Sequence, residues 1–253
     1  MFTKAIVRTP CKKMVEGITT SHLGKPIYDI ALKQHQAYIQ ALKSCGLEVI
    51  ILPADERFPD SCFVEDTAVV NEKFAIVDRP GAITRQGEQN SIHAELKKHY
   101  SDIKIITAPG TLEGGDVMRI GSKYYVGLSD RTNHNGFNQF REICSQFNFE
   151  ANAIEMNEML HLKTGVNYLG DNTILVAGEF IEKEEFKSFT KIIVDPTESY
   201  AANCIRINAN IIMPKGFPIL KAKLQKIGVS ILELEMSEFQ KLDGGLSCLS
   251  LRF

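Results

Sequence analysis

The chain has 253 residues, of which 44% are hydrophobic and 24% are charged, and its formal net charge is −2. A chain of this length and composition can fill one large hydrophobic core, so we expect a single domain that spans residues 1–253. The near-neutral charge and the lack of a basic run argue against nucleic acid or a membrane surface as a partner.

The six cysteines contain no Cys-x-x-Cys pair, which favours reduced thiols over a disulfide framework or a zinc knuckle. The first residues are too short an apolar run for a signal peptide, and no apolar stretch could span a bilayer. There is also no Asn-x-Ser/Thr sequon. These features together predict a cytoplasmic protein.

The predicted elements repeat a unit of two strands, a helix and a further strand. The N-terminal part supplies a strand at 4–8, a helix at 29–45 that ends at Gly46, and a strand at 47–52. The first full unit has strands at 68–71 and 74–78, a helix at 88–100 and a strand at 103–107. The second has strands at 117–120 and 124–127, a helix from the cap Asn133 to 147, and a strand at 151–155.

The third unit is predicted to begin irregularly near His161 and to continue with a strand at 173–177, a helix near 183–189 and a strand at 191–194. The fourth has strands at 204–207 and 211–213, a helix at 218–227 and a strand at 230–234. A last strand at 246–252 would pair with residues 4–8. The α/β units would then close into a ring without open sheet edges.

A series of polar or reactive residues keeps step with these units. Glu65, Glu113, His161, Asn203 and Cys248 follow one another at intervals of 48, 48, 42 and 45 residues. Such a period is typical of radially repeated folds, whose equivalent positions meet at one end of the central axis. The alternative is an ordinary mixed α/β domain with an accidental period.

Cys248 and His161 are the candidates for covalent chemistry, because a cysteine nucleophile needs an imidazole to move protons. Gly244 and Gly245, which precede the cysteine, allow a close backbone approach or a positive φ. The alternative for His161 is a packed histidine between two leucines.

Several carboxylates would gather at the same end of the ring: Asp60, Glu65, Asp66, Glu113 and Asp116. Taken singly, Asp60 and Asp116 could each be solvated loop residues. An enclosed group of carboxylates needs a cation. No His-x-x-x-His pair supports a metal, so we expect no metal ion and no cofactor. A guanidinium, which is planar and permanently charged, fits better.

Eight segments, distributed over nearly the whole chain, carry a family resemblance: residues 7–10, 20–26, 52–61, 63–66, 108–116, 160–165, 198–203 and the tail around Cys248. With them the sequence resembles the dimethylarginine dimethylaminohydrolase family of guanidino-modifying enzymes. The resemblance implies a five-bladed β/α propeller and a homodimer. It also implies hydrolysis of asymmetric dimethylarginine or monomethylarginine to citrulline and an amine, through a covalent cysteine thiouronium.

The same resemblance implies roles for individual residues. Cys248 would be the nucleophile, His161 the general acid and base, and Glu113 the carboxylate partner of His161. The substrate-binding residues would be Asp66 with Glu65 and Asp60 for the guanidinium, Arg85 and Arg131 for the carboxylate, and the carbonyls of Ile18 and Leu242 for the α-ammonium. Ile18 departs from the leucine expected there, which a backbone contact tolerates. From sequence alone, the two arginines could equally be solvated loop cations.

Three rival functions remain open at this point. An arginine deiminase would be longer and would carry an aspartate two residues after the catalytic histidine, where this chain has Lys163. An amidinotransferase would share the cysteine and the histidine. A non-catalytic arginine-binding protein would retain the ring alone.

Two further expectations concern the site. The neighbouring carboxylates should keep free Cys248 mainly as the thiol. Residues 16–25, which include two glycines and Ile18, are predicted to form a mobile lid, with a static surface loop as the alternative.

Overall fold

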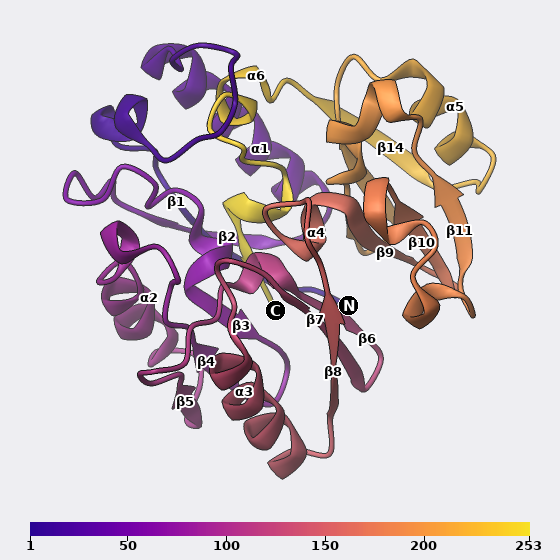
Figure 1. Ribbon diagram of the computed structural model, residues 1–253. Helices are drawn as coiled ribbons and strands as arrows, with labels where there is room; N and C mark the ends of the chain where they lie inside the picture. The colour runs from indigo at the N-terminus through magenta and orange to yellow at the C-terminus, as the bar shows by residue number, and fades with distance from the viewer.

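The computed structural model describes residues 1–253 and contains five three-stranded sheets arranged around a central axis (Figure 1). In each sheet the inner strand is antiparallel to the middle strand, and the middle strand is parallel to the outer strand. The fold is therefore the expected α/β propeller with five blades, and the accidental-period alternative is wrong.

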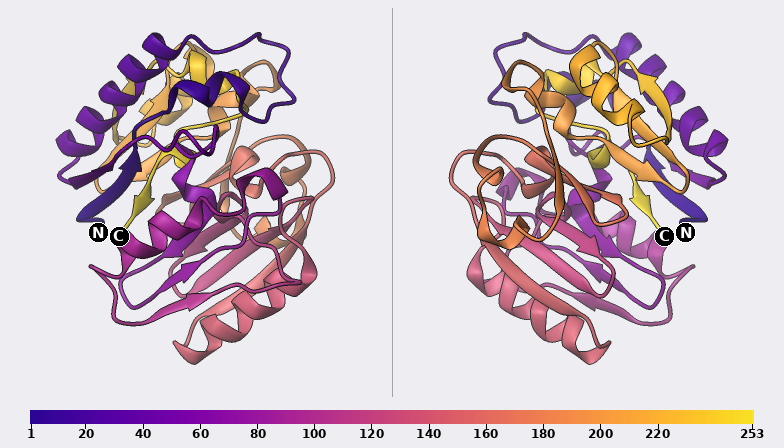
Figure 2. Two further views of the ribbon diagram at one scale, coloured as in Figure 1. Left: turned by 90° about the vertical axis from the view of Figure 1, so that its left-hand side faces the viewer. Right: turned by 90° about the vertical axis from the view of Figure 1, so that its right-hand side faces the viewer.

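The first sheet joins the two ends of the chain. Its middle strand β1 (Lys4–Arg8) pairs with β15 (Leu251–Arg252) on one side and with β2 (Glu48–Leu52) on the other. The termini lie side by side in both views of Figure 2, where Thr3 N donates to Phe253 O at 2.9 Å. Helix α1 (Tyr28–Ser44) precedes β2, in agreement with the predicted helix.

The other four sheets follow in chain order. The second contains β3 (Ala68–Val70), β4 (Ala75–Val77) and β5 (Ile103–Ile105), with α2 (Gln89–Leu96). The third contains β6 (Val117–Ile120), β7 (Lys123–Leu128) and β8 (Glu150–Glu155), with α3 (His134–Gln146). The fourth contains β9 (Val166–Gly170), β10 (Thr173–Val176) and β11 (Thr190–Ile193). The fifth contains β12 (Ile205–Ile207), β13 (Asn210–Pro214) and β14 (Ser230–Leu234), with α5 (Pro218–Gln225) and then α6 (Ser237–Gln240).

Two predicted elements differ from the structure. The helix near 183–189 is wrong, because this part of the fourth blade has only 3-10 turns, at Gly178–Phe180 and Glu184–Phe186. Phe180 and Phe186, one from each turn, are both buried in the same core cluster. The predicted strand at 246–252 is mostly a turn, since only Leu251–Arg252 pairs with β1.

Five short helical turns stand directly ahead of the inner strands, at the positions of the sequence period: η2 (Val64–Thr67), η4 (Gly114–Asp116), α4 (Leu162–Gly165), η7 (Pro196–Ala202) and η8 (Ser247–Leu249). Turns η8, η2, η4, α4 and η7 contact one another in that order. A Cβ on Gly114 would lie 2.0 Å from the carbonyl oxygen of Glu65, so only glycine permits this approach. The turns bring the periodic residues together.

The core is divided among the blades, and its largest cluster holds the C-terminal tail against α1. The hydroxyl of Tyr38, fully buried in this cluster, lies 2.8 Å from the Leu246 carbonyl oxygen and 2.7 Å from Ser250 Oγ. These contacts fix the tail on both sides of Cys248. None of the helices combines the length and the apolar character that crossing a membrane requires.

Candidate active site

A pocket of about 30 Å³ lies where the helical turns converge. Its walls are formed by Ile18, Asp60, Phe63, Asp66, Arg85, Arg131, Leu160, His161, Leu242, Asp243, Gly244 and Cys248. Eight of the ten residues expected at the site are in this set. A larger, more open hollow of about 440 Å³ shares Leu160 with the pocket but contains none of the expected residues.

Cys248 lies in turn η8 and is 9% exposed. Its Sγ accepts a hydrogen bond from the N–H of Gly245 at 3.3 Å, and Asn203 Oδ1 holds the turn by accepting from Ser247 N at 2.9 Å. Burial, together with the negative charges of Glu65 and Asp66, raises the pKa of Cys248 to about 12. The ligand-free residue is therefore a thiol at neutral pH, as the sequence predicted.

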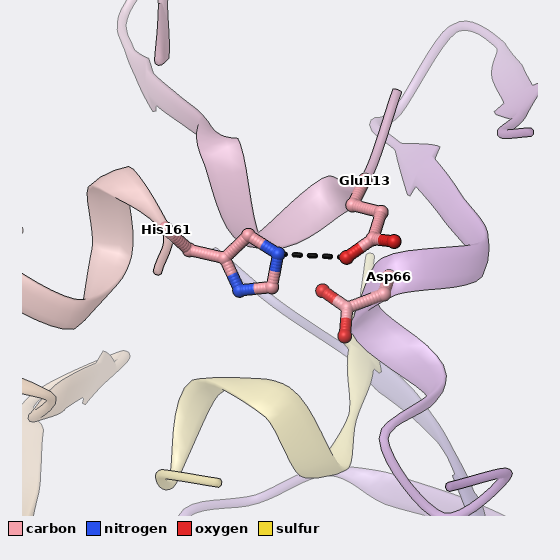
Figure 3. A group of neighbouring side chains, drawn as sticks. All are labelled: Asp66, Glu113 and His161. Atoms are coloured by element: carbon pink, nitrogen blue, oxygen red, sulfur yellow. Dashed lines mark hydrogen bonds and ion pairs between the residues drawn. The ribbon is translucent and has the colours of Figure 1, made fainter. Parts of the chain in front are cut away.

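His161 and Glu113 form a buried pair. His161 Nε2 lies 2.7 Å from Glu113 Oε2, and because a carboxylate only accepts, this nitrogen carries the proton (Figure 3). Burial alone would lower the pKa of His161, but Asp66, Asp116 and Glu113 outweigh burial and raise it to about 9. His161 is therefore an imidazolium at neutral pH, and its packed-histidine alternative does not describe it.

Glu113 is fully buried and has partners on both oxygens. Its Oε1 accepts from Gly81 N at 3.0 Å, while Oε2 accepts from His161. Burial would raise the pKa of Glu113, but the bond from His161 lowers it below its usual value. The pair thus consists of a carboxylate and an imidazolium, which suits a group that must donate a proton.

Asp66 and Asp60 also line the pocket, and Asp66 lies next to Glu113 and His161 (Figure 3). Asp66 accepts from Gly115 N at 3.1 Å through Oδ1 and from Arg85 Nη1 at 2.7 Å through Oδ2. Asp60 accepts from Ile18 N at 3.1 Å, and burial raises its pKa. One ligand atom each of Asp66, Glu113 and His161 lies within 4.8 Å of the others (Figure 3).

Glu65 does not line the pocket, in contrast to its neighbour Asp66. Its Oε1 lies 2.5 Å from Lys163 Nζ and 2.9 Å from Arg252 Nη2, so the carboxylate is paired with two cations beneath the site. The contact with Arg252 joins residues 187 positions apart. Sequence reasoning missed this partner, because ring closure rather than any local motif brings it there.

The two arginines differ in their surroundings. Arg85 is buried and donates to Asp66, to Glu88 at 2.9 Å and to the carbonyl of Phe63 at 3.1 Å. Arg131 keeps an exposed edge, with 17% of its side chain accessible, and its Nη1 lies 3.5 Å from Glu113 Oε1. Neither is a solvated loop cation, and Arg131 has more donors free for a ligand.

The sequence also gave no role to Asp243, which lines the pocket with a left-handed backbone (φ 56°). Its carboxylate accepts three hydrogen bonds from Thr19 and Thr20. The sequence signal that could have identified Asp243 was its position next to Leu242, which was expected to contact the substrate.

The matches with known proteins agree with this geometry. The family described as "N,N dimethylarginine dimethylhydrolase, eukaryotic" matches residues 19–210. The N(G),N(G)-dimethylarginine dimethylaminohydrolase of Pseudomonas aeruginosa is 46% identical over 254 residues, with 100% of both chains covered. The chain belongs to the dimethylarginine dimethylaminohydrolase family.

Solved structures of the family superpose closely. The enzyme from Pseudomonas aeruginosa, as a cysteine-to-serine mutant complexed with citrulline, has a TM-score of 0.99 at 46% identity, with 100% of both chains covered. A histidine-to-glycine dimethylarginine dimethylaminohydrolase in an adduct with S-methyl-L-thiocitrulline gives the same TM-score, identity and coverage. The fold predicted from the resemblance is thereby confirmed.

Proposed function

We propose that this protein hydrolyses Nω-methylated arginine, namely asymmetric dimethylarginine and monomethylarginine, to citrulline and dimethylamine or methylamine. The observation that carries the proposal is the convergence of a thiol, an imidazolium–carboxylate pair and two further carboxylates on one pocket. Membership in the family supports the same reaction. No cofactor enters the mechanism.

Substrate binding places the guanidinium against acidic groups and the amino-acid end against basic ones. Asp66 and Asp60 offer the carboxylate oxygens, whereas Glu65 is paired with Lys163 and Arg252 and does not line the pocket. Arg85 and Arg131 would hold the substrate carboxylate, and the carbonyls of Ile18 and Leu242 would accept from the α-ammonium. This arrangement holds the central guanidinium carbon near Cys248 in an orientation that favours attack.

The first chemical step forms a carbon–sulfur bond. The positive substrate promotes ionisation of Cys248, whose pKa is otherwise too high for a thiolate at neutral pH, and the thiol proton passes to solvent. The thiolate attacks the guanidinium carbon and gives a tetrahedral adduct. The carbon–nitrogen bond to the methylated nitrogen then breaks, and the His161 imidazolium protonates the departing amine. Glu113 stabilises the imidazolium throughout.

The second step releases the product. Neutral His161 takes a proton from water, and the resulting hydroxide attacks the carbon of the S-alkylthiouronium. The carbon–sulfur bond breaks and Cys248 leaves as the thiolate. The hydroxyl proton of the adduct passes to this thiolate as the carbonyl of citrulline forms, which restores the thiol. His161 has then regained the proton that it gave to the amine.

The position of Lys163 distinguishes this reaction from that of an arginine deiminase. Its ammonium is directed to Glu65, and the pocket wall has no carboxylate at residue 163. Without this carboxylate there is more space and less negative charge beside the terminal nitrogens of the substrate, which favours an N-methylated guanidinium.

Parallel incubation with asymmetric dimethylarginine, arginine and agmatine tests the proposal. We expect citrulline and dimethylamine in equal amounts from the first compound, much slower turnover of arginine, and no product with Cys248→Ser. Faster turnover of arginine would indicate a deiminase, and amidino transfer to an added amine would indicate an amidinotransferase. Binding of these compounds without formation of any product would instead support a non-catalytic arginine-binding protein.

The proposal extends to the setting of the enzyme. We propose that residues 1–253 act as a single catalytic domain, as a homodimer in the cytoplasm, on a free small molecule and without nucleic acid or a membrane. Its reduced cysteines and near-neutral charge support this setting. Light scattering of the purified chain tests the dimer.

A further inference from the structure

Asp243 connects the pocket wall to the loop that precedes α1. Its Oδ2 accepts from Thr20 N at 2.6 Å, from Thr20 Oγ1 at 3.0 Å and from Thr19 Oγ1 at 3.2 Å. Leu242 and Gly244, its two neighbours in sequence, line the pocket as well. One carboxylate oxygen therefore gathers three donors from a segment more than 220 positions away in the chain.

The loop, defined here as residues 17–25, is fixed at its ends and has no helix or strand between them. At one end Gly17 N donates to the Met14 carbonyl oxygen at 2.9 Å, and at the other Ile27 N donates to Glu238 Oε2 at 2.6 Å. Ile18 and Leu23 are exposed, so the loop has little apolar packing. Its remaining ties to the protein are the bonds to Asp243, to Asp60 and to the carbonyl of Lys241.

The pocket beneath the loop is nearly shut. Its volume of about 30 Å³ is far below the roughly 300 Å³ at the lower end of small-molecule sites. An amino acid can therefore be admitted only if part of the wall moves. The loop is the part whose attachment depends on a few hydrogen bonds, and Ile18 is its contribution to the wall.

We propose that Asp243 is a latch, a positioning residue that closes the loop over bound substrate and thereby sets the carbonyl of Ile18. It acts through Thr19 and Thr20 and does not touch the reacting atoms. Bonds from N–H or O–H groups to a carboxylate are about twice as strong as neutral ones, so a single side chain can bias the loop toward closure. The link to substrate binding rests on the proposed function, whereas the latch itself does not.

The backbone at residue 243 permits clean variants. Its φ of 56° is accessible to glycine and to asparagine, so Asp243→Gly removes the latch and Asp243→Asn weakens it without new strain. Asp171→Asn is a matched control, because Asp171, in the turn between β9 and β10, also has a left-handed φ (48°) and pairs with Arg206 of β12.

Hydrogen exchange of the ligand-free protein tests the latch directly. We expect amides of residues 17–25 to exchange about tenfold faster in Asp243→Gly, which is the effect of losing a hydrogen bond to a charged group. The exchange rates of these amides should be intermediate in Asp243→Asn and unchanged in Asp171→Asn. Equal exchange in Asp243→Gly and the wild type would overturn the proposal. If Asp243→Gly does not fold, Asp243→Asn is measured instead, and exchange of residues 17–25 at the wild-type rate would again overturn the proposal.

Kinetics then test the connection to the substrate. KM for asymmetric dimethylarginine should rise about tenfold in Asp243→Gly while kcat changes less, because the loss of these hydrogen bonds makes closure of the loop less favourable. Thr20→Val should raise KM in the wild type but not in Asp243→Gly, because Asp243→Gly has already removed the hydroxyl contact that Thr20→Val takes away. Additive effects would contradict a shared latch. A wild type without turnover would refute the proposed function, and the exchange result would still decide the latch.

Discussion

Asp66 and Arg85 form a buried ion pair at the wall of the pocket, with 2.7 Å between Oδ2 and Nη1. Arg85 also pairs with Glu88 at 2.9 Å, so two buried carboxylates share one guanidinium. The arginine that is expected to bind substrate is therefore part of the framework that holds Asp66 in place.

This dual role predicts different outcomes at the two arginines. Arg85→Ala leaves Asp66 and Glu88 without their cation, and we expect the free energy of unfolding to fall by about 3–5 kcal/mol. Arg131→Ala removes a partly exposed side chain and should cost about 1 kcal/mol or less while raising KM. Chemical denaturation of both variants, with kinetics of Arg131→Ala, checks the contrast. A larger loss of stability at Arg131 would contradict it.

The raised pKa of Cys248 predicts slow alkylation. Because the thiolate is the reactive form, the rate with iodoacetamide at residue 248 should rise about tenfold per pH unit from pH 7 to 10. Peptide mapping distinguishes Cys248 from the other five cysteines, which are also buried. A plateau below pH 8 in the ligand-free enzyme would show a thiolate and would refute the assignment.

Glu113→Gln tests the role proposed for the pair of Glu113 and His161. In the wild type His161 keeps its proton up to a pKa of about 9, so loss of the imidazolium should limit kcat/KM above that pH. Without the carboxylate the pKa of His161 falls, and this limb moves to lower pH. Since general acid catalysis contributes at least about 100-fold, we expect kcat to fall by about that factor. A pH profile with an unshifted basic limb would argue against the pair.

Gly114 is predicted to be indispensable for the contact between turns. In Gly114→Ala the new methyl group would meet the backbone of Glu65, which cannot rotate away, and we expect a loss of about 1–3 kcal/mol or more. Gly121→Asn is the control, because nothing lies within 4 Å of its Cβ position and asparagine tolerates its φ of 60°. Thermal unfolding of both variants gives the comparison, and equal stability would contradict the steric argument.

The sequence predicted those parts of the fold that depend on local pattern. Helix α3 begins after Asn133, whose side chain accepts from Gly136 N as a cap should, and the period of the reactive residues matches the five turns. The helix near 183–189 was wrong because its polar residues suit both a helix and a turn. Phe180 and Phe186 are buried from two separate turns.

The sequence predicted the site residues that belong to recognisable motifs, but it did not predict which way each side chain points. Cys248, His161 and Asp66 occupy the pocket, whereas Glu65 turns to Lys163 and Arg252 below it. Adjacent residues in a tight turn point in different directions, and a sequence motif does not tell which of two acids faces the ligand. The partners of such side chains lie on other blades and are fixed only when the ring closes.

The proposed mechanism depends most on a covalent bond to the sulfur of Cys248. The direct measurement is mass spectrometry of the enzyme after rapid acid quenching during turnover of asymmetric dimethylarginine. We expect an adduct equal to the substrate without dimethylamine, located on the peptide that contains Cys248. Formation of citrulline with no such adduct, or with the adduct on another residue, would contradict it.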